Sequence, residues 1–275
     1  MSAEEKTGQS DAVLMARALD LARDHLGLVW PNPSVGCVIL KDGEIISEAA
    51  TGVGGRPHAE ALAIENCKES VEGSTIFVSL EPCCHWGKTP PCTQAIIGAK
   101  AKKVVIAVLD SDPRMRGEGM RQLREAGVEV ELGLCEKEAT QLNEGFFHRI
   151  TYGRPFVTVL GSDANMESHL ADQDAVVSTR GSGLFVSFEY HRRRRSDFHT
   201  TDWFLSASEV DQELFASLGG TELMILSEHN DATSVDIEAA MMALGHRGLT
   251  RIAVDEADPL ADALRRANLI QARLG

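Results

Sequence analysis

The chain has 275 residues, of which 43% are apolar and 25% charged, and acidic side chains outnumber basic ones 41 to 27, giving a net charge of −14. This composition is typical of a globular protein long enough for two ordinary domains. The negative charge argues against a long nucleic acid as a partner, because the phosphate backbone would be repelled. A small phosphorylated molecule remains compatible, since a few local cations or a helix N-terminus can hold one phosphate.

The N-terminal sequence MSAEEKTGQSD is polar and acidic, unlike a signal peptide, and no later stretch reaches ~18 uninterrupted apolar residues. We therefore expect a cytoplasmic protein with no membrane partner. The one basic block, RRRR at 192–195, is expected to be a solvated face instead of a binding site.

Helical and strand patterns alternate through the first half of the chain. Residues 11–27 carry apolar side chains at helical spacing, and residues 31–40 and 43–50 read as two strands joined by a tight Asp42-Gly43 turn. A helix over 58–67 is followed by a buried strand over 74–80. The order is that of an α/β domain with an antiparallel hairpin near its start.

The alternation continues with a helix that Thr89 would cap, and then a buried strand over 102–110. One more helix and strand follow between 119 and 133. Residues 151–154 resemble a linker, so we expect one domain over 1–150 and a second over 151–275 that opens with the strand PFVTVL. Both should be α/β.

The six cysteines fall into two groups, because three of them lie within ten residues of one another. In a chain of this size and compartment we expect thiols and not disulfides, and the clustered three suggest a metal or catalytic site. The isolated ones lie in apolar surroundings and are expected to be core residues. The clustered set is Cys83, Cys84 and Cys92, and the isolated set is Cys37, Cys67 and Cys135.

His58, Cys83 and Cys92 are each expected at a helix start or just after a strand, where a thiolate is electrostatically favoured. One imidazole and two thiolates suit Zn²⁺ and leave the fourth tetrahedral position for water, which is the catalytic pattern. A structural site would need a fourth protein ligand. Cys84 or His85 could supply it, although a residue next to Cys83 rarely reaches the same ion.

Glu60 indicates the reaction class. A carboxylate two residues after a zinc-binding histidine can take a proton from the metal-bound water and pass it to a leaving amine. The zinc deaminase signature is H-x-E followed by P-C-x-x-C, and the chain has His58-Ala59-Glu60 and Pro82-Cys83 but Trp86 where the second cysteine would fall. Cys92 comes later, so the residues between form an inserted loop that could wall a pocket.

Four segments together resemble the deaminase half of the bifunctional riboflavin-biosynthesis deaminase/reductases: PNPSVG, His58-Ala59-Glu60, SLEPCCHWGKTPPC and LDSDPRMRGEG. The resemblance covers roughly residues 11–150. It implies a cytidine-deaminase-like α/β/α three-layer domain followed by a smaller α/β remnant of a dihydrofolate-reductase-like domain. It also implies zinc-dependent hydrolytic deamination of 2,5-diamino-6-ribosylamino-4(3H)-pyrimidinone 5′-phosphate, with His58, Cys83 and Cys92 as zinc ligands and Glu60 as proton shuttle.

The same resemblance implies that Asn32, Lys88 and Asp110 contact the substrate. Each has a simpler interpretation: Asn32 could be a rigid turn residue between two prolines, Lys88 a solvated surface lysine, and Asp110 a turn or capping residue beside Asp112-Pro113. Relatives commonly have asparagine where this chain has Asp112, which removes one expected polar contact.

The second half departs from the reductases of that family. Leu160 stands at their lysine position, SDANMESHLA replaces their Ser-Leu-Asp-Gly stretch, and Asp255-Glu256-Ala257 replaces a Glu-Gly-Gly that lets backbone approach a nucleotide phosphate. The region 155–275 is also short for such a domain. We therefore expect no reductase activity, no nucleotide cofactor, and a role in stability or homo-oligomer formation.

Three other functions fit parts of the pattern. A related deaminase could act on a pyrimidine or pteridine-type amine in a secondary-metabolite pathway, and a noncatalytic protein could use zinc for folding. A nucleic-acid-editing deaminase fits least, because only 5% of residues are aromatic and available for stacking on unpaired bases.

Overall fold

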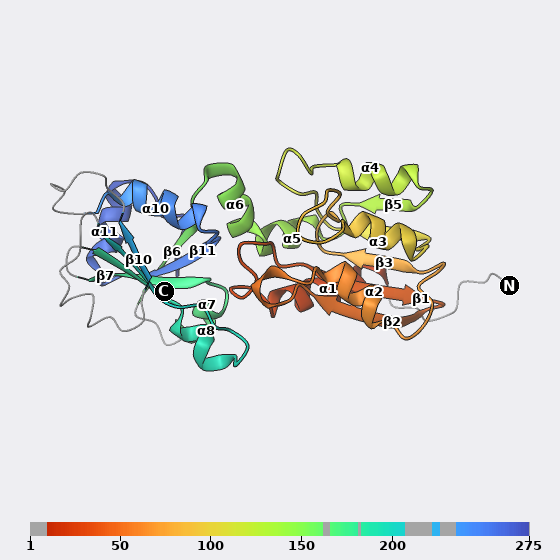
Figure 1. Ribbon diagram of the computed structural model, residues 1–275, viewed down its shortest axis with the longest axis horizontal. Helices are drawn as coiled ribbons and strands as arrows, with labels where there is room; N and C mark the ends of the chain where they lie inside the picture. Colours follow the sequence, from red (N-terminus) through yellow and green to blue (C-terminus); the bar gives the residue numbers. More distant parts are fainter. Residues whose placement is uncertain (1–9, 162–165, 181–182, 207–221, 226–234, 275) are drawn as a thin grey trace. The chain divides into compact units, whose positions relative to one another are not determined.

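The computed structural model describes residues 10–161, 166–180, 183–206, 222–225 and 235–274, and it divides the chain into two compact units. The first unit comprises 1–25 and 33–144, and the second comprises 26–32 and 145–275 (Figure 1). The division between the units falls at 144/145, six residues before the expected boundary at 150/151. In addition, the segment 26–32 belongs to the second unit. Residues 1–9, at the polar N-terminus, and 162–165, at the start of SDANMESHLA, lie outside the described residues.

The first unit is built on a five-stranded sheet of order β2-β1-β3-β4-β5. Strand β1 is antiparallel to β2 and β3, whereas β3, β4 and β5 are mutually parallel. The elements are α1 (Asp11–Arg23), β1 (Gly36–Lys41), β2 (Glu44–Ala50), η1 (Val53–Gly55), α2 (Ala59–Asn66), β3 (Thr75–Val78), α3 (Cys92–Gly98), β4 (Lys103–Ile106), α4 (Glu118–Glu125), β5 (Glu129–Leu132) and α5 (Glu136–Leu142).

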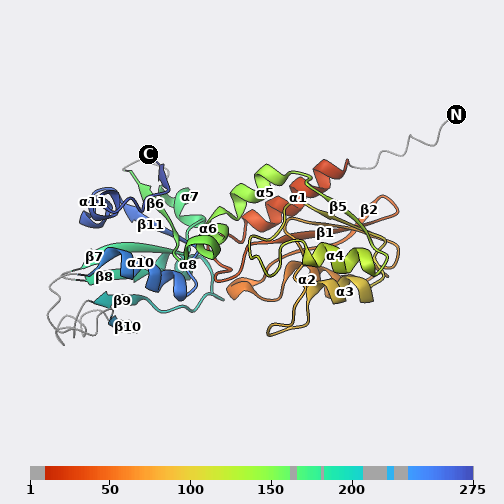
Figure 2. The same ribbon diagram turned by 90° about the horizontal axis from the view of Figure 1, so that it is seen from above.

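Helices cover both faces of this sheet, so the expected three-layer α/β/α arrangement is confirmed. Figure 2 shows α1 and α5 on one side and α2, α3 and α4 on the other. Gly36 allows the close approach of α1 to β1, because a Cβ there would lie 1.8 Å from the Ala18 carbonyl oxygen. The β1–β2 turn has positive φ at Asp42 (51°) and Gly43 (88°), as the Asp-Gly pair predicts.

Two helix starts differ from the sequence expectation. Helix α3 begins at Cys92 with Pro91 in the N-cap position, so the prolines precede the helix and Thr89 does not cap it. The Thr89 hydroxyl instead accepts a hydrogen bond from Arg56 (2.6 Å). His58 is the N-cap residue of α2 and has an extended backbone conformation, so it precedes the helix. Glu60 lies within the first turn.

The second unit holds a seven-stranded mixed sheet of order β10-β9-β8-β7-β11-β6-β12. Its centre is parallel, with β11 between β6 and β7, whereas β8 is antiparallel to both β7 and β9. The elements are α6 (Glu144–Tyr152), β6 (Phe156–Leu160), α7 (Met166–Ala171), β7 (Ala175–Arg180), β8 (Gly183–Ser187), α8 (Glu189–Arg194), β9 (Trp203–Ser206), β10 (Glu222–Ile225), α10 (Ile237–His246), β11 (Arg251–Asp255), α11 (Pro259–Arg266) and β12 (Ala272–Leu274).

The segment 26–32 packs within the second unit through its aromatic residue. The Trp30 ring stacks on Phe188 at a centroid distance of 5.5 Å and meets Trp203 edge-on at 5.8 Å. Gly27 has a φ of +73°, and a Cβ there would lie 2.5 Å from the Gln173 carbonyl oxygen. The segment is therefore fitted closely to its surroundings in this unit.

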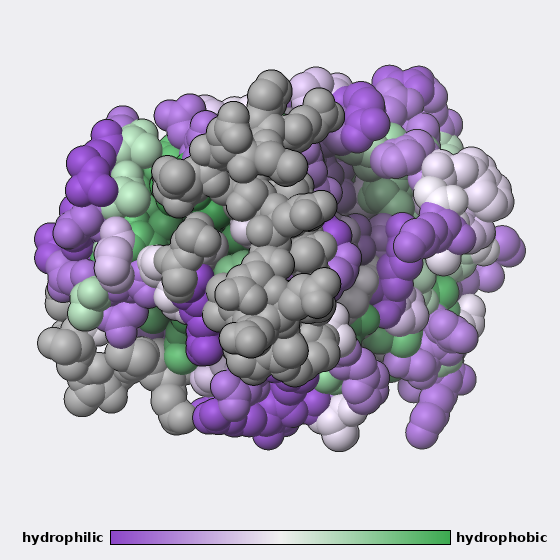
Figure 3. All heavy atoms as spheres, turned by 60° about the vertical axis from the view of Figure 1, so that its left-hand side comes forward, coloured by the Kyte–Doolittle hydropathy of each residue, from purple (hydrophilic) through white to green (hydrophobic). Residues whose placement is uncertain are grey.

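The arginine block belongs to α8 and its C-terminal end, and its members are engaged by neighbouring side chains. Arg192 pairs with Asp202 (2.7 Å), Arg193 with Glu189, and Arg195 with Asp197 (3.1 Å), while the Arg194 guanidinium lies over the Tyr190 ring. On the face shown in Figure 3, hydrophilic side chains surround patches of apolar ones. Within the described residues, no helix is long and apolar enough to cross a membrane.

Candidate metal centre

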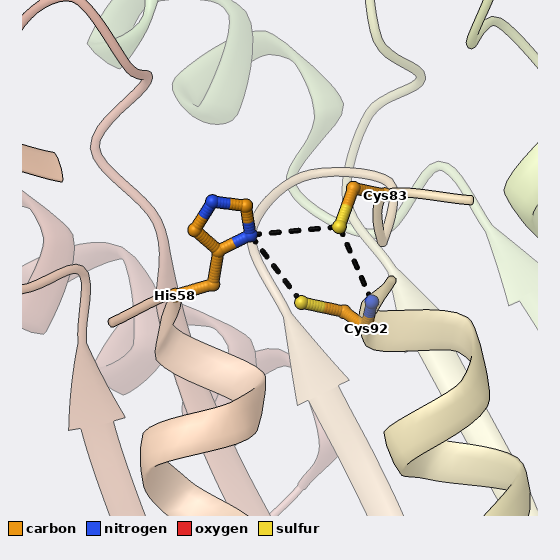
Figure 4. Close-up of side chains that lie close together, drawn as sticks. All are labelled: His58, Cys83 and Cys92. Atoms are coloured by element: carbon orange, nitrogen blue, oxygen red, sulfur yellow. Dashed lines mark hydrogen bonds between the residues drawn. The ribbon is translucent and has the colours of Figure 1, made fainter. Parts of the chain in front are cut away.

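Three side chains from separate segments of the first unit converge on one point. The Nδ1 atom of His58 lies 3.5 Å from the Cys83 sulfur and 3.4 Å from the Cys92 sulfur (Figure 4). Their ligand atoms all lie within 4.8 Å of one another, and the group is half-buried to buried. An imidazole nitrogen facing two sulfurs is a donor set that fits zinc, so the predicted convergence of these residues is confirmed.

The fold brings each ligand to this point by its position in an element. His58 precedes the first turn of α2, Cys92 opens α3, and Cys83 follows the strand end of β3. The loop and helix are joined by two backbone donors: the N–H of Cys92 to the Cys83 sulfur (3.2 Å) and the N–H of Thr93 to the Cys83 carbonyl oxygen (3.1 Å). The first turn of α3 thus stabilises a thiolate at Cys83.

The electrostatics of the group favour the thiolate form of Cys83 over that of Cys92. A hydrogen bond from the Cys92 thiol, with further help from His58, lowers the pKa of Cys83 to about 4. The same hydrogen bond raises the pKa of Cys92, and burial adds to the increase. The pKa of His58 is raised, first by its contact with Cys83. These groups therefore share protons as a unit.

Glu60 stands beside the group without being part of it. Its side chain is buried, with 3% of its surface exposed, and burial followed by the charge of Cys83 raises its pKa to about 7. Among the described residues the metal-binding group contains only His58, Cys83 and Cys92. A buried carboxylate whose pKa lies near neutrality can both accept and release a proton, which suits general acid–base chemistry.

The two alternative ligands, Cys84 and His85, face another residue. The Cys84 thiol lies 3.9 Å from the Met115 sulfur, and His85 Nδ1 lies 2.6 Å from that same sulfur. Burial raises the pKa of Cys84, which keeps it a thiol. In the described part of the chain no fourth His, Cys, Asp or Glu joins the group, which is compatible with an open fourth position on a bound ion.

Of the three cysteines expected in the core, Cys37 is buried, whereas Cys67 and Cys135 are not. Cys37 is fully buried in β1, and its pKa is raised by burial and by the charge of Glu60. Cys67 and Cys135 are partly buried, and the Cys67 thiol lies 3.8 Å from the Ile46 carbonyl oxygen.

The three predicted substrate contacts lie in different settings. Asp110 is buried, with 9% of its surface exposed, and burial raises its pKa; its side chain accepts the N–H of Asp112 (2.8 Å). Lys88 is exposed in the inserted loop after Cys84. Asn32 belongs to the segment that groups with the second unit, where its N–H donates to the Val29 carbonyl oxygen (3.1 Å). Contact of these residues with a substrate stays a prediction.

Sequence reasoning missed Glu81, a buried carboxylate two residues before Cys83. It accepts three backbone N–H groups, from Asp110, Gly117 and Met120. The only signal in the sequence is its place in the Glu-Pro-Cys motif, which does not reveal its partners because they lie about 30 to 40 residues further along the chain.

Comparison with known proteins agrees with this geometry. The cytidine and deoxycytidylate deaminase zinc-binding region matches residues 9–108. The riboflavin biosynthesis protein RibD of Aquifex aeolicus is 48% identical over 149 residues, covering 54% of this chain and 42% of that protein. The chloroplastic riboflavin biosynthesis protein PYRD of Arabidopsis thaliana is 42% identical over 227 residues, which cover 82% of this chain and 51% of that protein. The matches thus span about half the length of these relatives.

Solved structures extend the similarity into the second unit. Form 2 of Acinetobacter baumannii RibD superposes with a TM-score of 0.72 at 27% identity, covering 94% of this chain and 84% of that one. A diaminohydroxyphosphoribosylaminopyrimidine deaminase/5-amino-6-(5-phosphoribosylamino)uracil reductase from Thermotoga maritima gives a TM-score of 0.70 at 27% identity. This match covers 91% of this chain and 83% of that one. The chain is therefore a homologue of the RibD-type riboflavin biosynthesis proteins, and its first unit contains a zinc-binding deaminase region.

Proposed function

We propose that the first unit is a zinc-dependent aminohydrolase that deaminates 2,5-diamino-6-ribosylamino-4(3H)-pyrimidinone 5′-phosphate in riboflavin biosynthesis and releases ammonia. The observation that carries the proposal is the group of His58, Cys83 and Cys92, whose ligand atoms lie within 4.8 Å of one another beside the buried Glu60. The zinc-binding deaminase match over residues 9–108 supports the same chemistry.

In this proposal His58 Nδ1 and the sulfurs of Cys83 and Cys92 hold the ion. Zinc bound there supplies an activated water molecule at neutral pH. Glu60 would accept one proton from that water and give it to the ring nitrogen while the hydroxide adds to the amine-bearing ring carbon. It would then take the second proton from the added hydroxyl group and give it to the amine nitrogen as the C–N bond breaks, so that ammonia leaves. The burial of Glu60 keeps bulk water from competing for the proton, and the pKa of about 7 allows both transfers.

Asp110, Lys88 and Asn32 are the proposed substrate contacts, with Asp110 and Asn32 binding the polar edge of the base and Lys88 a ring carbonyl or the phosphate. The proposed partner is a small phosphorylated pyrimidine and neither a nucleic acid nor a membrane, and the proposed location is the cytoplasm. The net charge of −14 supports the exclusion of a nucleic acid.

One residue favours a second candidate substrate. Where relatives commonly have asparagine, Asp112 is buried and pairs with Arg114, whose guanidinium lowers the pKa of that carboxyl. An ionised carboxylate is acceptor-only, whereas an asparagine amide also donates. A related pyrimidine or pteridine-type amine from a secondary-metabolite pathway is therefore the alternative substrate.

We further propose that the second unit carries no reductase activity and serves stability or homo-oligomer formation. Where the reductases have glycines, Glu256 lies between Arg265 (3.0 Å) and Arg273 as an ion-pair partner. A carboxylate there repels a nucleotide phosphate and occupies nearby cations. Leu160 at the position of the reductase lysine supports the same conclusion.

The test is ammonia release from the phosphorylated pyrimidine by the zinc-loaded protein, with and without NADPH. We expect deamination that is independent of NADPH and no NADPH oxidation. Glu60→Gln keeps the shape of the side chain and should retain zinc while turnover falls by at least about 10²-fold. Normal turnover by that variant would contradict the role of Glu60, and NADPH oxidation coupled to product reduction would contradict the inactive second unit.

Activity on other amines with none on this pyrimidine would favour the alternative substrate. Stoichiometric zinc with no aminohydrolase activity on any of them would indicate a metal that serves folding only.

A further inference from the structure

Glu81 is a buried carboxylate whose hydrogen bonds all go to the backbone of other segments. Only 4% of its surface is exposed. Oε2 accepts the N–H groups of Asp110 (3.2 Å) and Gly117 (2.9 Å), and Oε1 accepts the N–H of Met120 (3.2 Å). Its own N–H donates to the Val108 carbonyl oxygen (2.9 Å). Three donors compensate the burial of the charge, so the carboxylate is held in one place.

Two of these donors belong to the start of α4. The N-cap residue of that helix is Gly117, which has no side chain to cap the helix, and Met120 is the third helical residue. These are the two N–H groups that a capping box satisfies. Glu81 satisfies both from another segment, and its negative charge lies at the positive end of the helix. The carboxylate therefore fixes α4 against the loop that leads to Cys83.

Helix α4 in turn contacts both cysteine segments of the metal centre. A Cβ on Gly119 would lie 2.2 Å from the Pro82 carbonyl oxygen, so the first turn packs directly on that loop. One turn later, Gln122 accepts a hydrogen bond from the Thr93 hydroxyl (3.0 Å) and donates to the Cys84 carbonyl oxygen (3.4 Å).

The third donor connects Glu81 to the predicted substrate contact. The backbone of Asp110 is tied on one side by Glu81 Oε2, and its side chain accepts the N–H of Asp112. Because Glu81 also binds Val108, it fixes the turn after β4 at two points. Freeing that turn would let the Asp110 carboxyl move relative to the metal ligands, while Cys83 would remain tied to Cys92 and Thr93.

We propose that Glu81 is a positioning residue, which sets the orientation of Asp110 toward the substrate by binding its backbone together with the start of α4. This inference rests on the proposed function, because it takes Asp110 to be a substrate contact. Glutamine cannot replace Glu81 in this role, since its amide nitrogen would place N–H groups against a backbone N–H donor.

The experiment compares wild type, Glu81→Gln and Asp110→Asn with the phosphorylated pyrimidine as probe. We expect Glu81→Gln to retain one zinc per chain and to raise KM by about tenfold or more, with a smaller change in kcat. The same loss should appear as weaker substrate binding by calorimetry in a Glu60→Gln background, where there is no turnover. The Glu81→Gln/Asp110→Asn double variant should be little worse than Asp110→Asn alone, because both act on one contact.

Asp258→Asn is the matched control. Asp258 caps α11 by accepting the N–H of Leu260, and it also accepts the N–H and hydroxyl of Thr179 from a distant segment, but it lies in the second unit. It should leave KM unchanged. Glu81→Asp, which keeps the charge with a shorter reach, should give an intermediate KM and provides a second test if the glutamine variant does not fold.

A KM within about twofold of wild type in a folded Glu81 variant, accompanied only by a lower melting temperature, would overturn the inference and leave the proposed function standing. A zinc-loaded wild type that neither binds nor deaminates the phosphorylated pyrimidine would overturn the proposed function and this inference with it.

Discussion

At the scale of single residues, the adjacent cysteines Cys83 and Cys84 have opposite environments. Cys83 receives a backbone N–H and a thiol hydrogen bond, which together with His58 lower its pKa to about 4. Cys84 lies beside Met115, and burial raises its pKa. The Cys83 sulfur also belongs to the group with His58 and Cys92, whereas the Cys84 sulfur does not, so only one of the two neighbours is placed to bind zinc.

We therefore predict that Cys83→Ser and Cys92→Ser each weaken zinc binding by roughly a hundredfold or more, because each removes a ligand sulfur. Cys84→Ser, the neighbouring control, should bind zinc as wild type does. Competition with a chromogenic chelator measures all three. Equal zinc loss in Cys84→Ser would mean that this sulfur belongs to the site.

A second residue-scale property is the buried carboxyl of Asp174 in the second unit. Its side chain accepts the N–H and hydroxyl of Thr250 and the N–H of Arg251, which joins β7 to β11. Burial nevertheless raises its pKa from 3.8 to about 6, against the opposing effect of those donors and of the Arg251 charge. The folded state therefore binds this proton more tightly than the unfolded state does.

The consequence for stability has a definite sign. The contribution of Asp174 to the free energy of unfolding is fully present below about pH 4 and is lost as pH rises through about 6. For a pKa shift of about two units, the loss amounts to about 3 kcal/mol. Asp174→Asn keeps an acceptor oxygen for the same donors and carries no charge. We predict that it is more stable than wild type at pH 8 and that the difference shrinks toward pH 4.

Denaturant unfolding at several pH values measures this difference. A Trp86→Phe background leaves Trp30 and Trp203, which both lie in the second unit, as fluorescence reporters. A difference that stays constant from pH 4 to pH 8 would contradict the raised pKa.

At the scale of elements, α4 contributes to the metal centre without containing a ligand. Its first turn contacts the Glu81–Pro82 loop, and Gln122 reaches the segments of Cys84 and Cys92. The close contact depends on Gly119, because a side chain there would meet backbone and could not be accommodated by a rotamer change.

Gly119→Ala should therefore destabilise the first unit by about 1–3 kcal/mol. Gly98 in α3 is the matched control, because it is also helical but has no atom within 4 Å of an added Cβ. Gly98→Ala should stabilise the unit by about 0.5–1 kcal/mol. Thermal unfolding followed by circular dichroism compares them. A neutral Gly119→Ala would show that α4 can move away from the loop without loss.

The sequence predicted most elements of the first unit because their apolar periodicity and turn residues agree. The predicted start of α3 was wrong because Thr89 and the two prolines resemble a capping sequence. In the structure Pro91 takes the N-cap position, and the Thr89 hydroxyl accepts a hydrogen bond from Arg56. The metal group was predictable because its two residue types, histidine and cysteine, are infrequent in the chain and each of its three residues follows or opens an element. The contacts of Glu81 were not, since they depend on parallel strand packing between distant segments.

At the scale of the whole chain, the two units are not consecutive in sequence. The segment 26–32 follows α1 of the first unit and groups with the second. No local pattern could reveal this, because Trp30 reads as an ordinary apolar residue and its partners Phe188 and Trp203 lie more than 150 residues away. The second unit therefore depends on a piece of chain that the expected boundary at 150/151 would have assigned elsewhere.

The final prediction concerns that dependence. Trp30→Ala removes the ring that meets Phe188 and Trp203, and we expect it to destabilise the second unit by about 3 kcal/mol or more. Trp30→Phe is the control: it keeps an aromatic ring, and the indole N–H that it loses is buried without a hydrogen-bond partner in the structure. It should therefore cost much less.

With Trp86 replaced by Phe, Trp203 alone reports unfolding of the second unit in both Trp30 variants. Zinc binding by the first unit should be unaffected, because His58, Cys83 and Cys92 all lie in it. Equal stability of the alanine and phenylalanine variants would show that the segment 26–32 is dispensable to the second unit, and that this unit is complete within 145–275.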